Sequence, residues 1–200
     1  MTDLLSLLAD RRSIRRYTPD PIPDEIIEAL LTAASWAPSA HNRQPWRFAV
    51  IRHMEAKQRL AAAMGQRLRD DLRSDNVPAD IIEKDVNRSY QRITNAPLLI
   101  ILCLTMQDMD SYPDPVRQQH EWTMAVQSTA MAGQNLQLAA HTLGLGACWM
   151  CAPLFVPDLV RHTLNLPADW QPQALITIGF PAETRSKSRH PLATRVYFVD

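Results

Sequence analysis

The chain has 200 residues, and its 21 basic and 21 acidic side chains give a formal net charge of zero. Nucleic-acid-binding proteins normally carry a basic excess, so this balance argues against that class. The length suffices for one full-sized domain with a buried core. Three cysteines are too few for a disulfide framework, so we expect a reducing, cytoplasmic setting.

Apolar periodicity and turn residues predict alternating helices and strands. In chain order, the first half contains a short amphipathic helix at 1–10, a helix at 24–37, a strand at 47–52, a helix at 55–73, and a loop with a further helix within 74–95. A buried strand at 98–104 follows. This is the longest apolar stretch, and it is far shorter than the roughly 20 residues of a membrane span. We therefore expect a soluble protein.

The second half begins with a loop at 108–115 that contains two prolines and three aspartates, which we expect to be solvated. Helices are predicted at 121–143 and 156–164, and strands at 174–179 and 196–199. These elements, with no internal repeats and no obvious linker, predict one α+β domain over residues 1–200. The helix at 121–143 is rich in small residues, which favours a place at the centre of the fold or at a subunit interface.

Several common sites of chemistry are missing from the sequence. The best dinucleotide-binding candidate begins at Gly144 and Gly146, but Trp149 stands where the motif needs its third glycine. No glycine is followed by Lys-Ser or Lys-Thr, and no hydrolase elbow, zinc-protease helix or obvious carboxylate pair is present. Chemistry carried by a bound organic cofactor therefore remains the best explanation.

Arginines near the N-terminus form a candidate phosphate site. Residues 11–16 hold four guanidinium groups and a serine, and a planar guanidinium matches phosphate oxygens bidentately. Residues 185–189, Arg-Ser-Lys-Ser-Arg, would complete an anion cage if both segments met in one site. For each segment alone, a solvated basic turn is the alternative.

A polar loop and a cysteine pair are the other candidates. Residues 37–46 place Ser, His, Asn, Arg and Gln between two prolines, which suits a polar ligand, although a stiff connection with Trp46 as a core anchor is the alternative. Cys148 and Cys151 are spaced as in redox or zinc sites. No second pair supplies the missing zinc ligands, so we expect no metal and treat both cysteines as packing residues.

In combination, these segments resemble the FMN-dependent nitroreductase superfamily over essentially the whole chain. The resemblance rests on Arg-Arg-Ser-Ile-Arg at 11–15, Pro-Ser-Ala-His-Asn-Arg-Gln-Pro-Trp at 38–46, Leu-Gly-Leu-Gly at 143–146 and Lys-Ser-Arg at 187–189. It implies a central, mostly antiparallel sheet flanked by helices, with the long central helix at a dimer interface. It also implies a homodimer with flavin sites at that interface. The strand at 196–199 would exchange onto the partner subunit.

The resemblance further implies three groups of FMN-binding residues. The phosphate would contact Arg11, Arg12, Ser13, Lys187 and Arg189, with Arg15 near the ribityl chain or pyrimidine edge. The partner subunit would supply Pro38, Ser39, Asn42 and Gln44. The ring would pass Trp149, Met150, Cys151 and Ala152, with the Cys151 backbone N–H at N5, and Arg88 is the candidate contact from residues 85–95. No side chain is expected to be catalytic, because the flavin carries the hydride.

A narrower resemblance is to the flavin-reductase domain of enzymes that complete the deazaflavin coenzyme F-420. It rests on Ser-Tyr-Pro-Asp at 111–114, Glu-Trp-Thr-Met at 121–124, Gly-Ala-Cys-Trp at 146–149, and the segments at 155–161 and 166–172. Three functions follow as alternatives. They are reduction of the dehydro precursor of that coenzyme, general NAD(P)H-dependent reduction of nitro compounds or quinones (or a flavin-consuming relative), and flavin binding without turnover.

Overall fold

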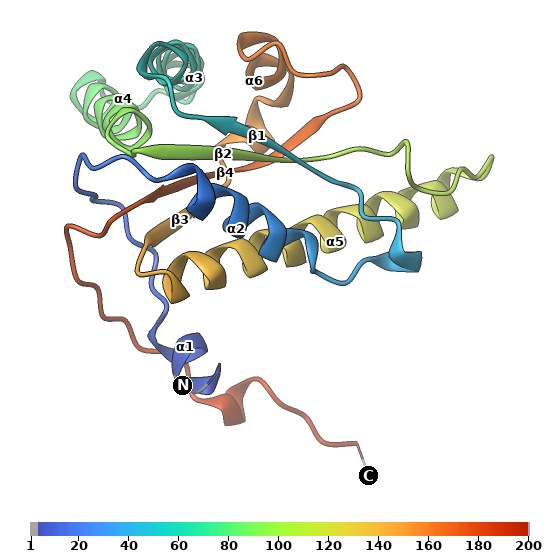
Figure 1. The fold of residues 1–200 in the computed structure, drawn as a ribbon. Coiled ribbons are helices and arrows are strands. Elements are labelled where there is room, and N and C mark those ends of the chain that lie inside the picture. The colour runs from blue at the N-terminus through green and yellow to red at the C-terminus, as the bar shows by residue number, and fades with distance from the viewer. Residues whose placement is uncertain (1–3, 200) are drawn as a thin grey trace.

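A four-stranded antiparallel sheet lies at the centre of the computed structural model, which describes residues 4–199 (Figure 1). The strands are β1 (Trp46–Ile51), β2 (Leu98–Leu104), β3 (Gly146–Met150) and β4 (Gln171–Gly179), in the spatial order β1-β2-β4-β3. This is the α+β architecture that the sequence predicts, with helices on both faces of the sheet.

Two layers of helices cover the sheet (Figure 1). On one face lie α2 (Asp24–Ser35) and α5 (Pro115–Thr142), and on the other lie α3 (Met54–Ser74), α4 (Ala79–Thr94) and α6 (Pro157–Thr163). The short α1 (Leu4–Asp10) lies outside these layers. Single 3-10 turns occur at Ala40–Asn42, Ala152–Phe155 and Leu192–Thr194.

The apolar strand β2 joins two hydrophobic cores. All its residues are buried, and successive side chains point to opposite faces of the sheet. Leu98, Ile100 and Leu102 pack in the core under α2 and α5. Leu99, Ile101 and Cys103 pack in the core under α3, α4 and α6. Burial on both faces explains why this strand is a continuous apolar run instead of an alternating one.

The long helix α5 packs on one face of the sheet, and its small residues allow the close approach that the sequence predicts. Gly133 is buried, and a Cβ there would lie 2.3 Å from the Trp149 ring, so the helix packs closely on the sheet. The helix begins at Pro115, six residues before the predicted start at 121. The Asp114 carboxylate accepts hydrogen bonds from the backbone N–H groups of Val116 and Arg117, which stabilises the first turn. The sequence predicts Pro115 as the last residue of a loop, but it occupies the first helical position, where proline is common.

The structure corrects two further predictions. Residues 196–199 form no strand. Within residues 4–199 no strand lies beside this segment to complete its backbone hydrogen bonds, and Tyr197 is accordingly 89% exposed. Residues 146–150 form the strand β3, which the periodicity of the sequence does not predict. The remaining predicted elements are present, and most of their ends lie within three residues of the predicted ones. The predicted start of the first helix, at residues 1–3, lies outside the described residues. Within residues 4–199, no helix combines the length and apolar character needed to cross a membrane.

Candidate functional site

The arginine-rich segment after α1 lies against the edge of the sheet. The backbone N–H of Ile14 donates to the Ala147 carbonyl of β3 at 3.1 Å. The N–H of Thr18 donates to the carbonyl of Phe180, just beyond β4, at 2.9 Å. The N–H of Ala182 donates to the carbonyl of Arg16 at 2.9 Å. Backbone hydrogen bonds therefore hold residues 13–18 between β3 and the chain that follows β4.

Two glycines allow this close approach. A Cβ at Gly146 would lie 2.7 Å from the Ile14 side chain, and a Cβ at Gly179 would lie 2.8 Å from Tyr17. Any larger residue would push the segment off the sheet. These glycines therefore serve packing, and neither belongs to a nucleotide-binding loop.

A cavity of about 400 Å³, called here the anion pocket, joins the two basic segments of the chain. It is lined by Arg11, Arg12, Ser13, Arg15, Arg185, Ser186, Lys187 and Arg189. All five residues expected around the phosphate therefore line one pocket, together with Arg15. The two segments, about 170 residues apart in sequence, meet because both border the β3–β4 edge.

The anion pocket is strongly cationic. Burial, followed by repulsion from Arg189 and Arg12, lowers the pKa of Arg11. The Arg12 Nε atom is buried without a hydrogen-bond partner among the described residues. Such a buried donor is costly when it is left unsatisfied, so this pocket suits an anion with several acceptor oxygens.

A second cavity of about 500 Å³, called here the arginine cavity, adjoins the anion pocket. Its lining is Arg15, Arg16, Tyr17, Arg88, Gln91, Arg92, Asn95, Ala182 and Arg185. Arg15 and Arg185 line both cavities. Arg88, the candidate from residues 85–95, lies here and pairs with Asp85 at 2.7 Å.

Arg92 also lines the arginine cavity, although no motif in the sequence marks it as a site residue. It lies four positions after Arg88, so both side chains project from one face of α4 into the arginine cavity. The spacing of Arg88 and Arg92 on one helix face can be read from the sequence. Their place beside the N-terminal segment cannot, because α4 approaches that segment only in the folded chain.

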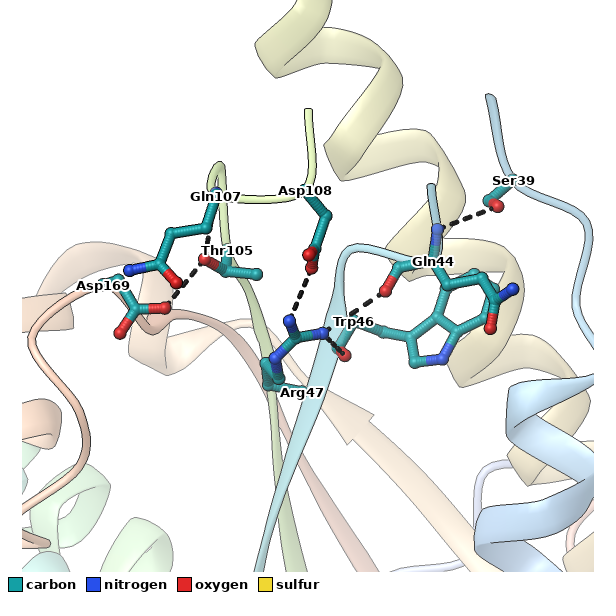
Figure 2. Close-up of polar contacts among 8 residues, drawn as sticks. All are labelled: Ser39, Gln44, Trp46, Arg47, Thr105, Gln107, Asp108 and Asp169. Atoms are coloured by element: carbon teal, nitrogen blue, oxygen red, sulfur yellow. Dashed lines mark hydrogen bonds and ion pairs between the residues drawn. The ribbon is translucent and has the colours of Figure 1, made fainter. Parts of the chain in front are cut away.

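The polar loop between α2 and β1 has a strained backbone. His41, Asn42 and Gln44 have φ values of 50°, 54° and 51°, in a region that L-residues other than Asn and Asp rarely adopt. Ser39 Oγ accepts from the Gln44 backbone N–H at 3.0 Å, which closes the loop (Figure 2). Ser128 Oγ on α5 accepts from the Ala40 N–H at 3.2 Å. Pro38, Asn42 and Gln44 are exposed, and Ser39 is half-buried.

Acidic residues of the 105–114 region hold this loop in place. Arg47 pairs with Asp108, and Arg43 pairs with Asp110 (Figure 2 shows the first pair). Beside them, Thr105 Oγ1 donates to Asp169 at 2.8 Å. Asp108 and Asp110, which the sequence predicts as solvated loop residues, are partly exposed, and each also neutralises an arginine from the facing segment.

Within one chain, the polar loop and the anion pocket lie apart. The loop contacts α5 at Ser128, whereas Arg11 and Arg12 share a neighbouring cavity with Gln137 and His141. Nine residues of helix, from Ser128 to Gln137, correspond to roughly 14 Å along the axis. Pro38, Ser39, Asn42 and Gln44 line neither the anion pocket nor the arginine cavity.

The third predicted group lies at the end of β3. Trp149 and Met150 belong to the strand, where they oppose Ile176 and Leu175. Trp149 is half-buried and packs on the core against Gly133. Beyond the strand, Cys151 is exposed and Ala152 begins a 3-10 turn.

The cysteine pair divides into two environments. Cys148 is buried, and burial raises the pKa of its thiol. Cys151 is exposed, and the Trp149 Nε1–H donates to its sulfur at 3.2 Å. The packing interpretation therefore holds for Cys148 and is wrong for Cys151.

Comparison with known protein families gives one match that spans most of the chain. The model described as the Nitroreductase family matches residues 8–180. A protein of Methanothermobacter thermautotrophicus, provisionally named NADH dehydrogenase/NAD(P)H nitroreductase, is 30% identical over 90% of this chain and 78% of its own length. A protein of Thermus thermophilus named NADH dehydrogenase is also 30% identical, over 86% of this chain and 84% of its own.

Solved structures agree with these matches. A protein of Desulfovibrio desulfuricans, provisionally described as a nitroreductase and crystallised in complex with FMN, has a TM-score of 0.76 and 29% identity over 100% of this chain and 98% of its own. A BluB-like flavoprotein of Clostridium difficile has a TM-score of 0.82 with all of both chains covered. Its identity of 22% makes that second likeness one of fold alone.

Proposed function

The chain belongs to the nitroreductase family and is an oxidoreductase with FMN as its cofactor, and from this premise we propose that the anion pocket holds the FMN phosphate. The observation that carries the proposal is the meeting of Arg11, Arg12 and Ser13 with Lys187 and Arg189 in one cavity. The phosphate is terminal in FMN, so a cationic pocket suits it, and no glycine-rich loop is needed.

The pocket fits this group chemically. A phosphate dianion offers three strong acceptor oxygens, and Arg12 Nε is a buried donor that lacks a partner among residues 4–199. An anion there would also relieve the repulsion that contributes to the lowered pKa of Arg11. Ser13 adds a hydroxyl donor beside these cations.

When bound, FMN supplies hydride transfer between a reduced donor and an acceptor. In the proposed site, Arg15 lies at the boundary of the two cavities. Its cation would favour negative charge at the pyrimidine edge of the ring. The backbone N–H of Cys151, at the exposed end of β3, is proposed to meet the ring. The names of the relatives support NAD(P)H as the donor.

The polar loop is proposed to act on the flavin of a partner subunit. This proposal is supported by the distance between the loop and the anion pocket along α5, and by the exposure of Asn42 and Gln44. Strained backbone conformations tend to persist at sites where a ligand or partner uses them. The exposed residues 196–199 are proposed to lie on the same partner.

A second candidate function concerns the acceptor. The motifs at 111–114, 121–124 and 146–149 favour the dehydro precursor of the deazaflavin coenzyme over a general nitro compound or quinone. Adding the precursor with NADH or NADPH to the flavin-loaded protein tests this directly. Consumption of one NAD(P)H for each double bond reduced supports it. Turnover of quinones and nitro compounds without turnover of the precursor leaves the general reductase.

The cofactor proposal is tested by the visible spectrum of the purified protein and by chromatography of the released flavin. We expect a yellow protein that yields FMN at about one per chain. Release of FAD would contradict the phosphate assignment, because the anion pocket is built for a terminal phosphate. A protein that is colourless and refuses added FMN would contradict the whole proposal.

A further inference from the structure

The arginine cavity contains more positive charge than a flavin ring requires. Five guanidinium groups line it. In the proposed flavin site, the phosphate lies in the adjoining pocket, among Arg11, Arg12, Lys187 and Arg189. The ring itself is neutral when oxidised and gains at most one negative charge on reduction. One cation, Arg15, is placed to meet that charge.

Carboxylates offset only part of the remaining charge. Asp85 pairs with Arg88 at 2.7 Å, and Glu183 pairs with Arg185 at 2.6 Å. Glu183 is already engaged, since its other oxygen accepts from the Arg15 backbone N–H at 2.8 Å. Among residues 4–199, no ion pair involves Arg16 or Arg92. The Arg15 guanidinium also has no ion pair among these residues, but the proposed function assigns it to the flavin, so Arg16 and Arg92 are the charges of the cavity that neither a carboxylate nor the flavin offsets.

Arg92 is held in an unfavourable position for a cation. Its side chain is half-buried, and burial, followed by repulsion from Arg88 and Arg15, lowers its pKa. Like charges packed together cost free energy unless an anion lies among them. Gln91 and Asn95 line the same cavity, and their side-chain amides add neutral hydrogen-bond donors. The combination matches a carboxylate or phosphate group.

We infer that the arginine cavity binds an anionic group of the acceptor, so that the enzyme prefers acceptors bearing a carboxylate or phosphate over neutral ones. Arg16 and Arg92 are the residues that would determine this specificity. The cavity volume of about 500 Å³ has room for such a group beside the flavin. The inference rests on the proposed function, because it assigns the anion pocket to FMN and the neighbouring cavity to the acceptor.

The test measures binding to the FMN-loaded protein by isothermal titration calorimetry, with turnover as a second readout. The probes are 4-nitrobenzoate and 4-nitrobenzamide, which have similar shape and differ in charge. The variants are Arg16→Gln, Arg92→Gln and the double variant. Arg59→Gln on α3 is the control, because it removes an exposed arginine that lines neither cavity.

We expect the wild type to bind the benzoate more tightly than the benzamide. The double variant should lose at least about tenfold in this preference, as the loss of charge-assisted hydrogen bonds predicts. The control should keep the preference, and all variants should keep one FMN per chain. Raising the ionic strength should reduce the preference of the wild type.

Any one of three results would overturn the inference. The first is that the wild type binds both probes equally or binds neither. The second is that the double variant keeps the preference for the benzoate, and the third is that the double variant loses FMN. The last result would mean that Arg16 and Arg92 hold the flavin itself. Failure of the wild type to load FMN at all would refute the proposed function instead, so the two failures are distinguishable.

Discussion

The anion pocket and the polar loop are fixed in the structure by different means. Backbone hydrogen bonds to Ala147 and Phe180 place the arginine segment, so its position does not depend on its arginine side chains. The polar loop is instead held by side chains, through Ser39, Ser128 and the Arg47–Asp108 pair. The arginines are thereby free to bind a ligand, whereas much of the loop's polar chemistry is used to hold its own shape.

The two regions also differ in completeness. The anion pocket contains cations from both ends of the chain. The tip of the polar loop, where Asn42 is exposed and left-handed, lines neither the anion pocket nor the arginine cavity. Under the proposed function, the phosphate half of the flavin site therefore lies within one chain, and the polar loop would act on the flavin of a second copy.

The largest expected effect comes from removing phosphate contacts. Replacing Arg11 and Ser13 together by alanine should weaken FMN binding at least about 100-fold, since two contacts to a dianion are lost. Flavin content after gel filtration measures this, and circular dichroism checks the fold. Arg59→Ala is the control and should retain full flavin. Unchanged occupancy in the double variant would show that the phosphate lies elsewhere.

Mixed dimers test the division of the site between two chains. One chain carries Arg11→Ala with Ser13→Ala, and the other carries Ser39→Ala with Asn42→Ala; different affinity tags allow purification of the mixed dimer. If the loop acts across the interface, one of its two sites is intact, and about half of the wild-type FMN content should return. If the loop acts within its own chain, both sites stay defective and no flavin returns.

A smaller effect is expected from disturbing the support of the arginine segment. In Gly146→Ala the new methyl group would lie 2.7 Å from Ile14. Overpacking of this kind typically costs about 1–3 kcal/mol, so thermal stability and FMN affinity should both fall. Gly65→Ala is the matched control, because its methyl group would meet Val86 at 3.3 Å, on helices away from the pocket. Its FMN affinity should match that of the wild type.

The smallest effect is expected in the ion pairs of the loop. Asp108→Asn removes the partner of Arg47, and both side chains are about one-third exposed, at 38% and 31%. Pairs with this exposure contribute on the order of 1 kcal/mol or less, so urea unfolding should show a small, salt-sensitive loss. A loss of several kcal/mol would mean that the loop depends on this pair far more than on Ser39 and Ser128.

Much of the fold follows from local patterns in the sequence. The strand at 98–104 has the predicted bounds, because a continuous apolar run suits a strand buried on both faces. Most helices begin and end near their proline and charge signals. Local patterns do not predict β3, because Gly146, Ala147 and Cys148 have little strand propensity of their own. Pairing with β4 makes this segment a strand.

Local composition already identifies the chemistry of the candidate residues: guanidinium groups in 11–16 and 185–189, polar donors in 38–44, and no nucleotide-binding glycine loop. The tertiary structure decided which of them meet. Arg11 and Arg189 share a pocket, and Arg92 joins Arg16 in a second one, because α4 and both terminal segments border the same end of the sheet. Contacts between residues so far apart depend on strand order and helix packing, which no local pattern encodes.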